Sequence, residues 1–142
     1  MPSSAYNKFN LTVEDWLKAG CNFSTDTFKV MLTNTAPVAT NNVKSDIIEI
    51  AAGNGYTAGG ATTTVSLSNS GGTETVTATP VTFTATGAGS IGPFRYPVLY
   101  DATTNFLICY FDYGVAVTLN GVSSDSSTIT FGSGANQLFT LV

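Results

Sequence analysis

The glycine-rich stretch EIAAGNGYTAGG, residues 49–60, has a spacing that suits a nucleotide site. Gly53, Gly55 and Ala58 match the G-x-G-x-x-A pattern of dinucleotide-binding loops. Glu74 follows roughly 20 residues later, where such loops are followed by a ribose-binding acid. That chemistry also requires a helix directly after the glycines, because the helix N-terminus receives the pyrophosphate.

The residues after these glycines favour a turn instead. Residues 61–70 read ATTTVSLSNS, and a run of Thr, Val and Ser is a poor helix former that suits an edge strand. No alternation of strands and helices occurs along the chain. Asn54 and Gly55 both tolerate positive φ. We therefore interpret the stretch as a tight turn and expect no nucleotide or other cofactor.

Other residue types that perform catalysis are scarce. The 142 residues include no histidine, so the usual general base and the commonest metal ligand are missing. No serine lies in a G-x-S-x-G motif or three residues before a lysine. Nine carboxylates offer acid pairs for glycoside cleavage, but most lie in turn-like sequences, where aspartate is a good turn residue. We expect no enzymatic activity, no catalytic residues and no small-molecule substrate.

Metal and disulfide sites receive little support from the sequence. Asp101 and Asn105 offer oxygen ligands for a loop calcium site, but no spacing motif supports it, so we interpret Asp101 as a turn residue and predict no metal. Cys21 and Cys109 are far apart and in unlike contexts. We predict two free thiols rather than a bridge.

The composition restricts the possible partners. Charged residues make up only 10% of the chain, against about 25% in an average soluble domain. The surface must therefore be covered by hydroxyls and amides, or by neighbouring chains. A net charge of −4 with five scattered basic residues argues against nucleic acid. No signal peptide and no apolar run of membrane-spanning length is visible. We expect no membrane contact, and synthesis and retention in a cytoplasm.

Short runs rich in Thr, Val, Phe and Tyr alternate with turns rich in Gly, Asn and Ser. This spacing predicts an all-β fold, an antiparallel β-sandwich or jelly roll, with one domain over residues 1–142. We predict strands over residues 27–33, 62–68, 73–86, 92–101, 105–114, 115–120, 127–131 and 136–142.

Three runs carry more specific information. Residues 27–33 alternate between apolar and other side chains, which predicts a half-buried strand. Residues 106–111, FLICYF, are apolar on both faces, which predicts a central strand or one whose second face a partner covers. Residues 46–52, DIIEIAA, suit either a strand or a short helical turn.

Residues 1–24 form an N-terminal segment in which we predict a short helix. Thr12 and Asp15 make a Thr-x-x-Asp N-cap signal, and Gly20 offers a stop. The apolar residues of this helix share one face: Val13, Trp16 and Leu17. Two helical turns are not stable alone in water. This face therefore either covers an open end of its own domain or docks onto a neighbouring subunit.

Further interface candidates lie outside the helix. Phe9 precedes it, and Arg95 stands between Phe94 and Tyr96. Arg95 can pair with Asp112 or stack on an aromatic ring. Arg95 and Tyr96 can also anchor an interface, where both residue types are enriched. The candidate interface residues are therefore Phe9, Trp16, Leu17, Arg95 and Tyr96.

Four stretches resemble a family of small virion proteins of tailed bacteriophages: TFKVMLTNTAPVAT, EIAAGNGYTAGG, GPFRYPVLYD and FDYG, in this order. Some members of that family are capsid decoration, or cement, proteins, and others are described only as structural proteins. The resemblance extends from Tyr6 to about Gly114 and fades through VSSDSSTITFGSGANQ. It brings no catalytic or metal-binding residues.

The resemblance implies a protein that is made in the host bacterium's cytoplasm and then binds the major capsid protein on the virion surface. Decoration proteins commonly occupy three-fold positions, so we expect a homotrimer. A carbohydrate- or receptor-binding module of a tail or fibre is the alternative. The possible stacking residues for that role are Tyr56, Tyr96, Tyr100, Tyr110 and Tyr113.

Overall fold

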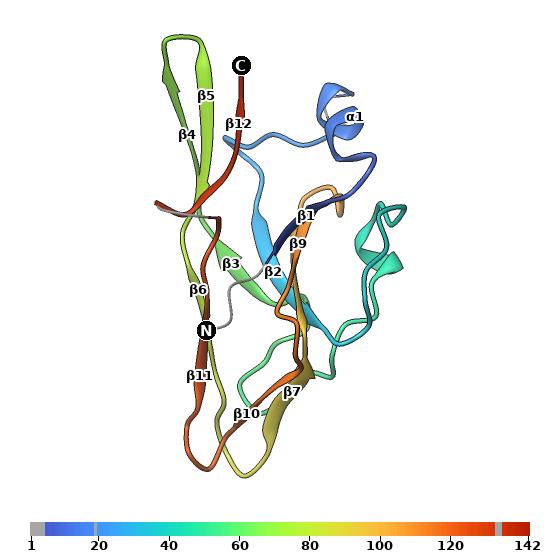
Figure 1. The fold of residues 1–142 in the computed structure, drawn as a ribbon. Helices are drawn as coiled ribbons and strands as arrows, with labels where there is room; N and C mark the ends of the chain where they lie inside the picture. Colours follow the sequence, from blue (N-terminus) through green and yellow to red (C-terminus); the bar gives the residue numbers. More distant parts are fainter. Residues whose placement is uncertain (1–4, 19, 133–134) are drawn as a thin grey trace.

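The computed structural model describes residues 5–18, 20–132 and 135–142. Antiparallel strands form several sheets, and α1 (Thr12–Leu17) is the one α-helix among the described residues. Figure 1 shows two layers, with a five-stranded sheet on one side and strands β4, β5, β12, β6 and β11 along the other. The prediction of an all-β, sandwich-like fold is confirmed.

The five-stranded sheet has the order β1-β9-β8-β2-β3, and each neighbouring pair is antiparallel. Its strands are β1 (Ala5–Lys8), β9 (Leu107–Asp112), β8 (Tyr96–Asp101), β2 (Phe28–Thr33) and β3 (Ala61–Thr63). Strand β9 lies between β1 and β8, so the prediction of an interior strand at FLICYF is confirmed.

The remaining strands form three smaller sheets. Their bounds are β4 (Val65–Ser70), β5 (Thr73–Ala78) and β12 (Gln137–Leu141) in order β12-β5-β4, β6 (Val81–Thr84) with β11 (Ser126–Ile129), and β7 (Ser90–Phe94) with β10 (Val117–Asn120). Three predicted strands are each divided, at Thr64, Pro80 and Arg95, because the chain passes from one sheet to another at these points. Pro80 also lacks the amide that a continuous ladder needs.

Apolar residues gather on both faces of the five-stranded sheet. The larger core lies between the layers and includes Phe28 and Ile108. A smaller core on the opposite face contains Phe9, Met31 and Ile47, together with residues of β8 and β9. The strand predicted at 27–33 is confirmed as β2, but the prediction that only one of its faces is buried is wrong. Met31 is fully buried because the N-terminal segment and the loop before β3 cover the second face.

The glycine-rich stretch is a tight turn, as predicted. Asn54 and Gly55 have φ values of 54° and 100°, and Gly53 and Tyr56 exchange two backbone hydrogen bonds around them. Strand β3 begins directly after Gly60, so the glycines open a strand. The DIIEIAA segment is not a strand, and only its first residue belongs to a helical turn: Asp46 ends a 3₁₀ turn, η1 (Lys44–Asp46), and the rest is an irregular stretch held to β2 by an isolated bridge.

Candidate functional site

An apolar groove of about 270 Å³ lies between α1, β1 and β12. It is lined by Tyr6, Lys8, Val13, Trp16, Phe139, Thr140 and Leu141. Both bordering strands are edge strands of their sheets, β1 in the five-stranded sheet and β12 in the three-stranded one. An edge strand has backbone N–H and C=O groups without a neighbouring strand, so it can accept an extended segment of another chain.

Trp16 lines the groove and makes aromatic contacts with residues of both layers. Its ring stacks on Phe139 with centroids 4.6 Å apart and meets Phe23 edge-on at 5.0 Å. Phe23 in turn stacks on Phe28 of β2 at 5.1 Å. Trp16 therefore covers an open end of its own fold, which is one of the two roles considered for the helix. Phe139 and Phe23 were not identified from the sequence.

The helix begins near the predicted residue but is oriented differently. Leu11 occupies the N-cap without a side-chain hydrogen bond, and the Thr12 hydroxyl instead donates to the carbonyls of Leu107 and Ile108 in β9. Thr12 and Asp15 are buried, whereas Leu17 is 84% exposed. The predicted capping by Thr12 is therefore wrong. Val13 and Trp16 do share a face, since both line the groove, but the helix residues that the fold buries are Thr12 and Asp15, and Leu17 is exposed.

The other candidate interface residues are engaged within the subunit. Phe9 is 1% exposed, in the smaller core. Arg95 forms two hydrogen bonds with the Asp112 carboxylate, of 2.6 and 2.9 Å, and its guanidinium lies 5.2 Å from the centre of the buried Tyr96 ring. Both contacts considered for Arg95 are therefore present. The hydrogen bonds from Arg95 and from the Gly114 amide lower the pKa of Asp112.

The tyrosines offer little surface for stacking on a sugar. Tyr56, Tyr96, Tyr100 and Tyr113 are buried, and Tyr110 is half-buried against Phe9. The Tyr56 hydroxyl donates to Glu49 and accepts from the Leu32 amide. Burial, followed by the bond to Glu49, raises the pKa of Tyr56. The Tyr100 hydroxyl donates to the Gly59 carbonyl, so Tyr56 and Tyr100 hold the loop before β3 against the sheet.

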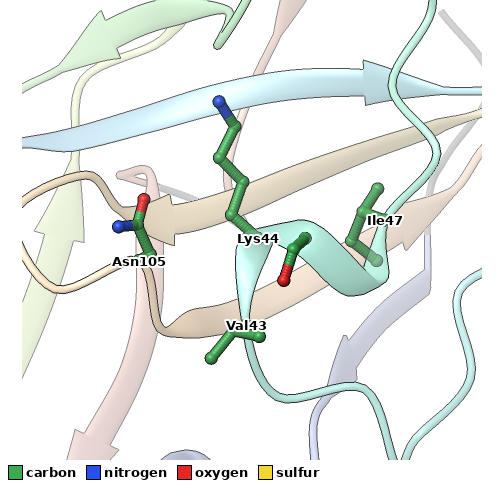
Figure 2. Close-up of a pocket in the computed structure, with 5 residues that line it drawn as sticks. Val43, Lys44, Ile47 and Asn105 are labelled. Carbon is green, nitrogen blue, oxygen red and sulfur yellow. The ribbon is translucent and has the colours of Figure 1, made fainter.

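A second hollow, of about 440 Å³, lies at η1 (Figure 2). It is open and lined by Val43, Lys44, Ser45, Ile47 and Asn105. Lys44 is its one charged lining residue. The amine of Lys44 lies 3.9 Å from Glu49 and 5.5 Å from the centre of the Tyr100 ring. The amine therefore makes its contacts inside the subunit, with Glu49 and Tyr100.

One cluster contains several possible metal ligands. The Cys21 sulfur and carboxylate oxygens of Asp26 and Asp101 lie within 4.8 Å of one another. Asp101 accepts the amides of Thr103 and Thr104, so its interpretation as a turn residue is confirmed.

Cys21 and Cys109 are both free thiols, as predicted. Burial raises the pKa of each thiol, and for Cys21 the neighbouring Asp101 raises it further.

Among the residues that the structure describes, no helix has the length and apolar character needed to cross a membrane. Comparison of the chain with protein-family models, with curated proteins and with solved structures finds no match. The groove and the cluster at Cys21 must therefore be interpreted from their own chemistry.

Proposed function

We propose that this protein is a non-enzymatic virion structural protein, a capsid decoration protein that binds the major capsid protein and stabilises the shell as a homotrimer. The observation that carries the proposal is the exposed apolar surface of α1 and the groove beside it. Leu17 is 84% exposed, Leu11 40% and Val13 36%. Leu141, across the groove, is 49% exposed. An apolar cluster of this kind is typical of an interaction site.

The shape of the groove suits an extended partner segment. A strand laid along β1 or β12 gains main-chain hydrogen bonds, while alternate side chains enter the space beside Trp16. Lys8 is the one charged residue of the lining. The partner segment is therefore expected to be mostly apolar, with at most one acidic side chain near Lys8.

Because the binding position is repeated on a capsid, a small surface of this kind can be sufficient to hold the protein on the shell. Each subunit of a trimer contributes one copy, so weak contacts act together through the high effective concentration of the second and third sites. The sequence resemblance to phage decoration proteins supports the same proposal. The scarcity of surface charge agrees with a protein surrounded by other chains.

Substitution of Leu17 tests the surface directly. Leu17→Asp should weaken binding to shells that lack the protein by about 30-fold, the effect of losing an interface contact worth about 2 kcal/mol. Because Leu17 makes little contact within the subunit, the free energy of unfolding should barely change. Val122→Asp is the matched control, since Val122 is 75% exposed in the β10–β11 loop. Equal binding by both variants in a co-sedimentation assay would reject the α1 surface.

Trp16→Ala separates the two roles of the helix. Since Trp16 is half-buried against Phe139 and Phe23, its loss should cost about 2 kcal/mol of stability, below the 3–5 kcal/mol of a fully buried ring. Urea unfolding measures that cost, and sedimentation of the folded fraction measures trimer formation. A folded fraction that is monomeric for both this variant and the unaltered protein would contradict the proposed trimer.

Particles without the protein test the cement role. They should lose DNA at a lower temperature than complete particles. If they are equally heat-stable but no longer adsorb to cells, the protein is a receptor-binding module and the decoration proposal fails.

A further inference from the structure

We propose that Cys21, Asp26 and Asp101 form a binding site for a divalent transition-metal ion of the zinc type. The proposal stands on the placement of these side chains and is independent of the capsid role. The site joins two parts of the chain: the loop between α1 and β2, and the end of β8.

The three ligand atoms are close enough to share one ion. They lie within 4.8 Å of one another, and the ligand atoms of a tetrahedral zinc centre are about 3.4–3.6 Å apart, so they need to approach by no more than roughly 1.4 Å. Asp101 is the last residue of β8, and the amides of the turn that follows hold its Oδ1. Its carboxylate also accepts the Thr104 hydroxyl and hydrogen-bonds with the Cys21 thiol, and loss of the thiol proton on metal binding would free that acceptor. Asp26 is held by the Asn22 amide.

Asp15 supplies an independent indication that a ligand belongs here. The residue is 8% exposed, and its buried Oδ2 has no hydrogen-bond partner among the residues that the structure describes. The Gly20 amide donates to the Asp15 carbonyl, which holds α1 beside the residue preceding Cys21. A Cβ on Gly20 would touch both that carbonyl and the Phe106 ring, so Asp15 lies against the β8–β9 turn.

No ion pair in the described part of the chain includes Asp26 or Asp101, whereas the charge of Lys18 acts on Asp15. The ion pairs join Lys18 with Glu14, Lys44 with Glu49, and Arg95 with Asp112. Asp101 is fully buried and Asp26 is half-buried. Burying a carboxylate without a countercharge is costly, and a divalent ion would offset that cost by coordination.

The sulfur ligand selects the kind of ion. Calcium and magnesium take oxygen ligands, whereas zinc and cobalt accept a thiolate together with carboxylates. The thiol must lose its proton as the metal–sulfur bond forms, and the proton passes to solvent or buffer, so binding should strengthen as the pH rises. The bound ion would hold α1 and the loop after it against the sheet, close to the groove.

Titration of the full-length, tag-free protein with Zn²⁺ and Co²⁺ tests the site. We expect saturable binding with one ion per chain, a rise in melting temperature, and a thiolate-to-cobalt charge-transfer band in the near ultraviolet. Cys21→Ser should abolish the band and weaken zinc binding at least ~10-fold, and Asp26→Asn should weaken zinc binding at least ~10-fold as well. Asp46→Asn is the matched control, because Asp46 likewise accepts backbone amides in an exposed turn.

Three results would overturn the proposal. One is the absence of zinc binding at large excess by protein with a native circular dichroism spectrum. Another is zinc binding of equal strength by the unaltered protein and by both cluster variants. The third is a rise in melting temperature with Ca²⁺ but not with Zn²⁺, which would assign the carboxylates to an oxygen-only site and exclude the thiol.

Discussion

The five-stranded sheet and the β12-β5-β4 sheet differ sharply in burial and in composition, since β8 reads YPVLYD whereas β4 reads VSLSNS. Every residue of β8 is buried, because core residues cover both of its faces. In β4, the five residues from Ser66 to Ser70 are exposed. Figure 1 shows the β4–β5 hairpin extending beyond the body of the molecule. The first sheet is therefore expected to contribute more to stability for each residue than the second, whose outer hairpin is largely exposed to solvent.

Truncation of one apolar side chain in each sheet should show the largest difference. Ile108→Ala removes a fully buried side chain between the layers and should cost about 2–5 kcal/mol of unfolding free energy. Leu67→Ala, in β4, should cost less than about 1 kcal/mol, since Leu67 is 46% exposed. Urea unfolding gives both values. Equal costs would mean that the projecting sheet is as firmly packed as the central one.

A methyl group added to one glycine near each sheet sharpens the comparison. Gly60 and Gly71 both have positive φ, of 75° and 58°. A Cβ on Gly60 would lie 1.8 Å from the Val30 carbonyl oxygen of β2, whereas one on Gly71 meets nothing within 4 Å.

Gly71→Ala should therefore cost only the backbone term of about 1–2 kcal/mol. Gly60→Ala should cost about 1–3 kcal/mol more, because β2 must move to admit the methyl group. Thermal or urea unfolding of the two variants measures the difference. If Gly60→Ala lowers the free energy of unfolding no more than Gly71→Ala does, the loop does not lie as close to β2 as the structure indicates.

The acid response should report on the Arg95–Asp112 pair at the margin of the central sheet. The pKa of Asp112 is lowered on folding, so the pair stabilises the protein above the unfolded-state pKa of about 3.9 and loses that contribution as the pH falls through the folded-state value. Arg95→Met should raise the Asp112 pKa and flatten this acid dependence. Titration of the carboxyl groups by nuclear magnetic resonance measures the Asp112 pKa in the unaltered protein and in Arg95→Met.

Asp46 is the internal reference for that titration, because backbone amides, and not an arginine, lower its pKa. The pKa of Asp46 should be the same in the unaltered protein and in Arg95→Met. An Asp112 pKa that does not change in Arg95→Met would show that the ion pair is absent in solution.

Treatment with a reducing agent should have the smallest effect on stability. Cys21 and Cys109 are free, so a reducing agent should leave the melting temperature unchanged in metal-free buffer. A drop of several degrees would reveal a disulfide, since closing a long loop is worth a few kcal/mol.

Local patterns in the sequence determined the all-β class, the Asn54–Gly55 turn and the turn role of Asp101. Each depends on residues within a few positions of one another, such as a residue that tolerates positive φ or a side chain that accepts a nearby amide. Complementary charge also allowed Arg95 to be matched with Asp112 across two strands.

Tertiary structure decided which faces are covered. The alternation in residues 27–33 indicates one apolar face, yet Met31 is buried because Ile47 and Phe9 arrive from distant segments. In the same way, the Thr12 hydroxyl bonds to β9 because the helix packs there, although its sequence signal is that of a cap.

The groove and the thiol–carboxylate cluster were likewise decided wholly by the tertiary structure. Trp16 meets Phe139 from the far end of the chain, and Cys21 meets Asp101 across some 80 positions of sequence. Periodicity reports only whether a side chain can be buried. Which partner buries it depends on how the sheets close over one another, and that is set by the packing of the whole chain.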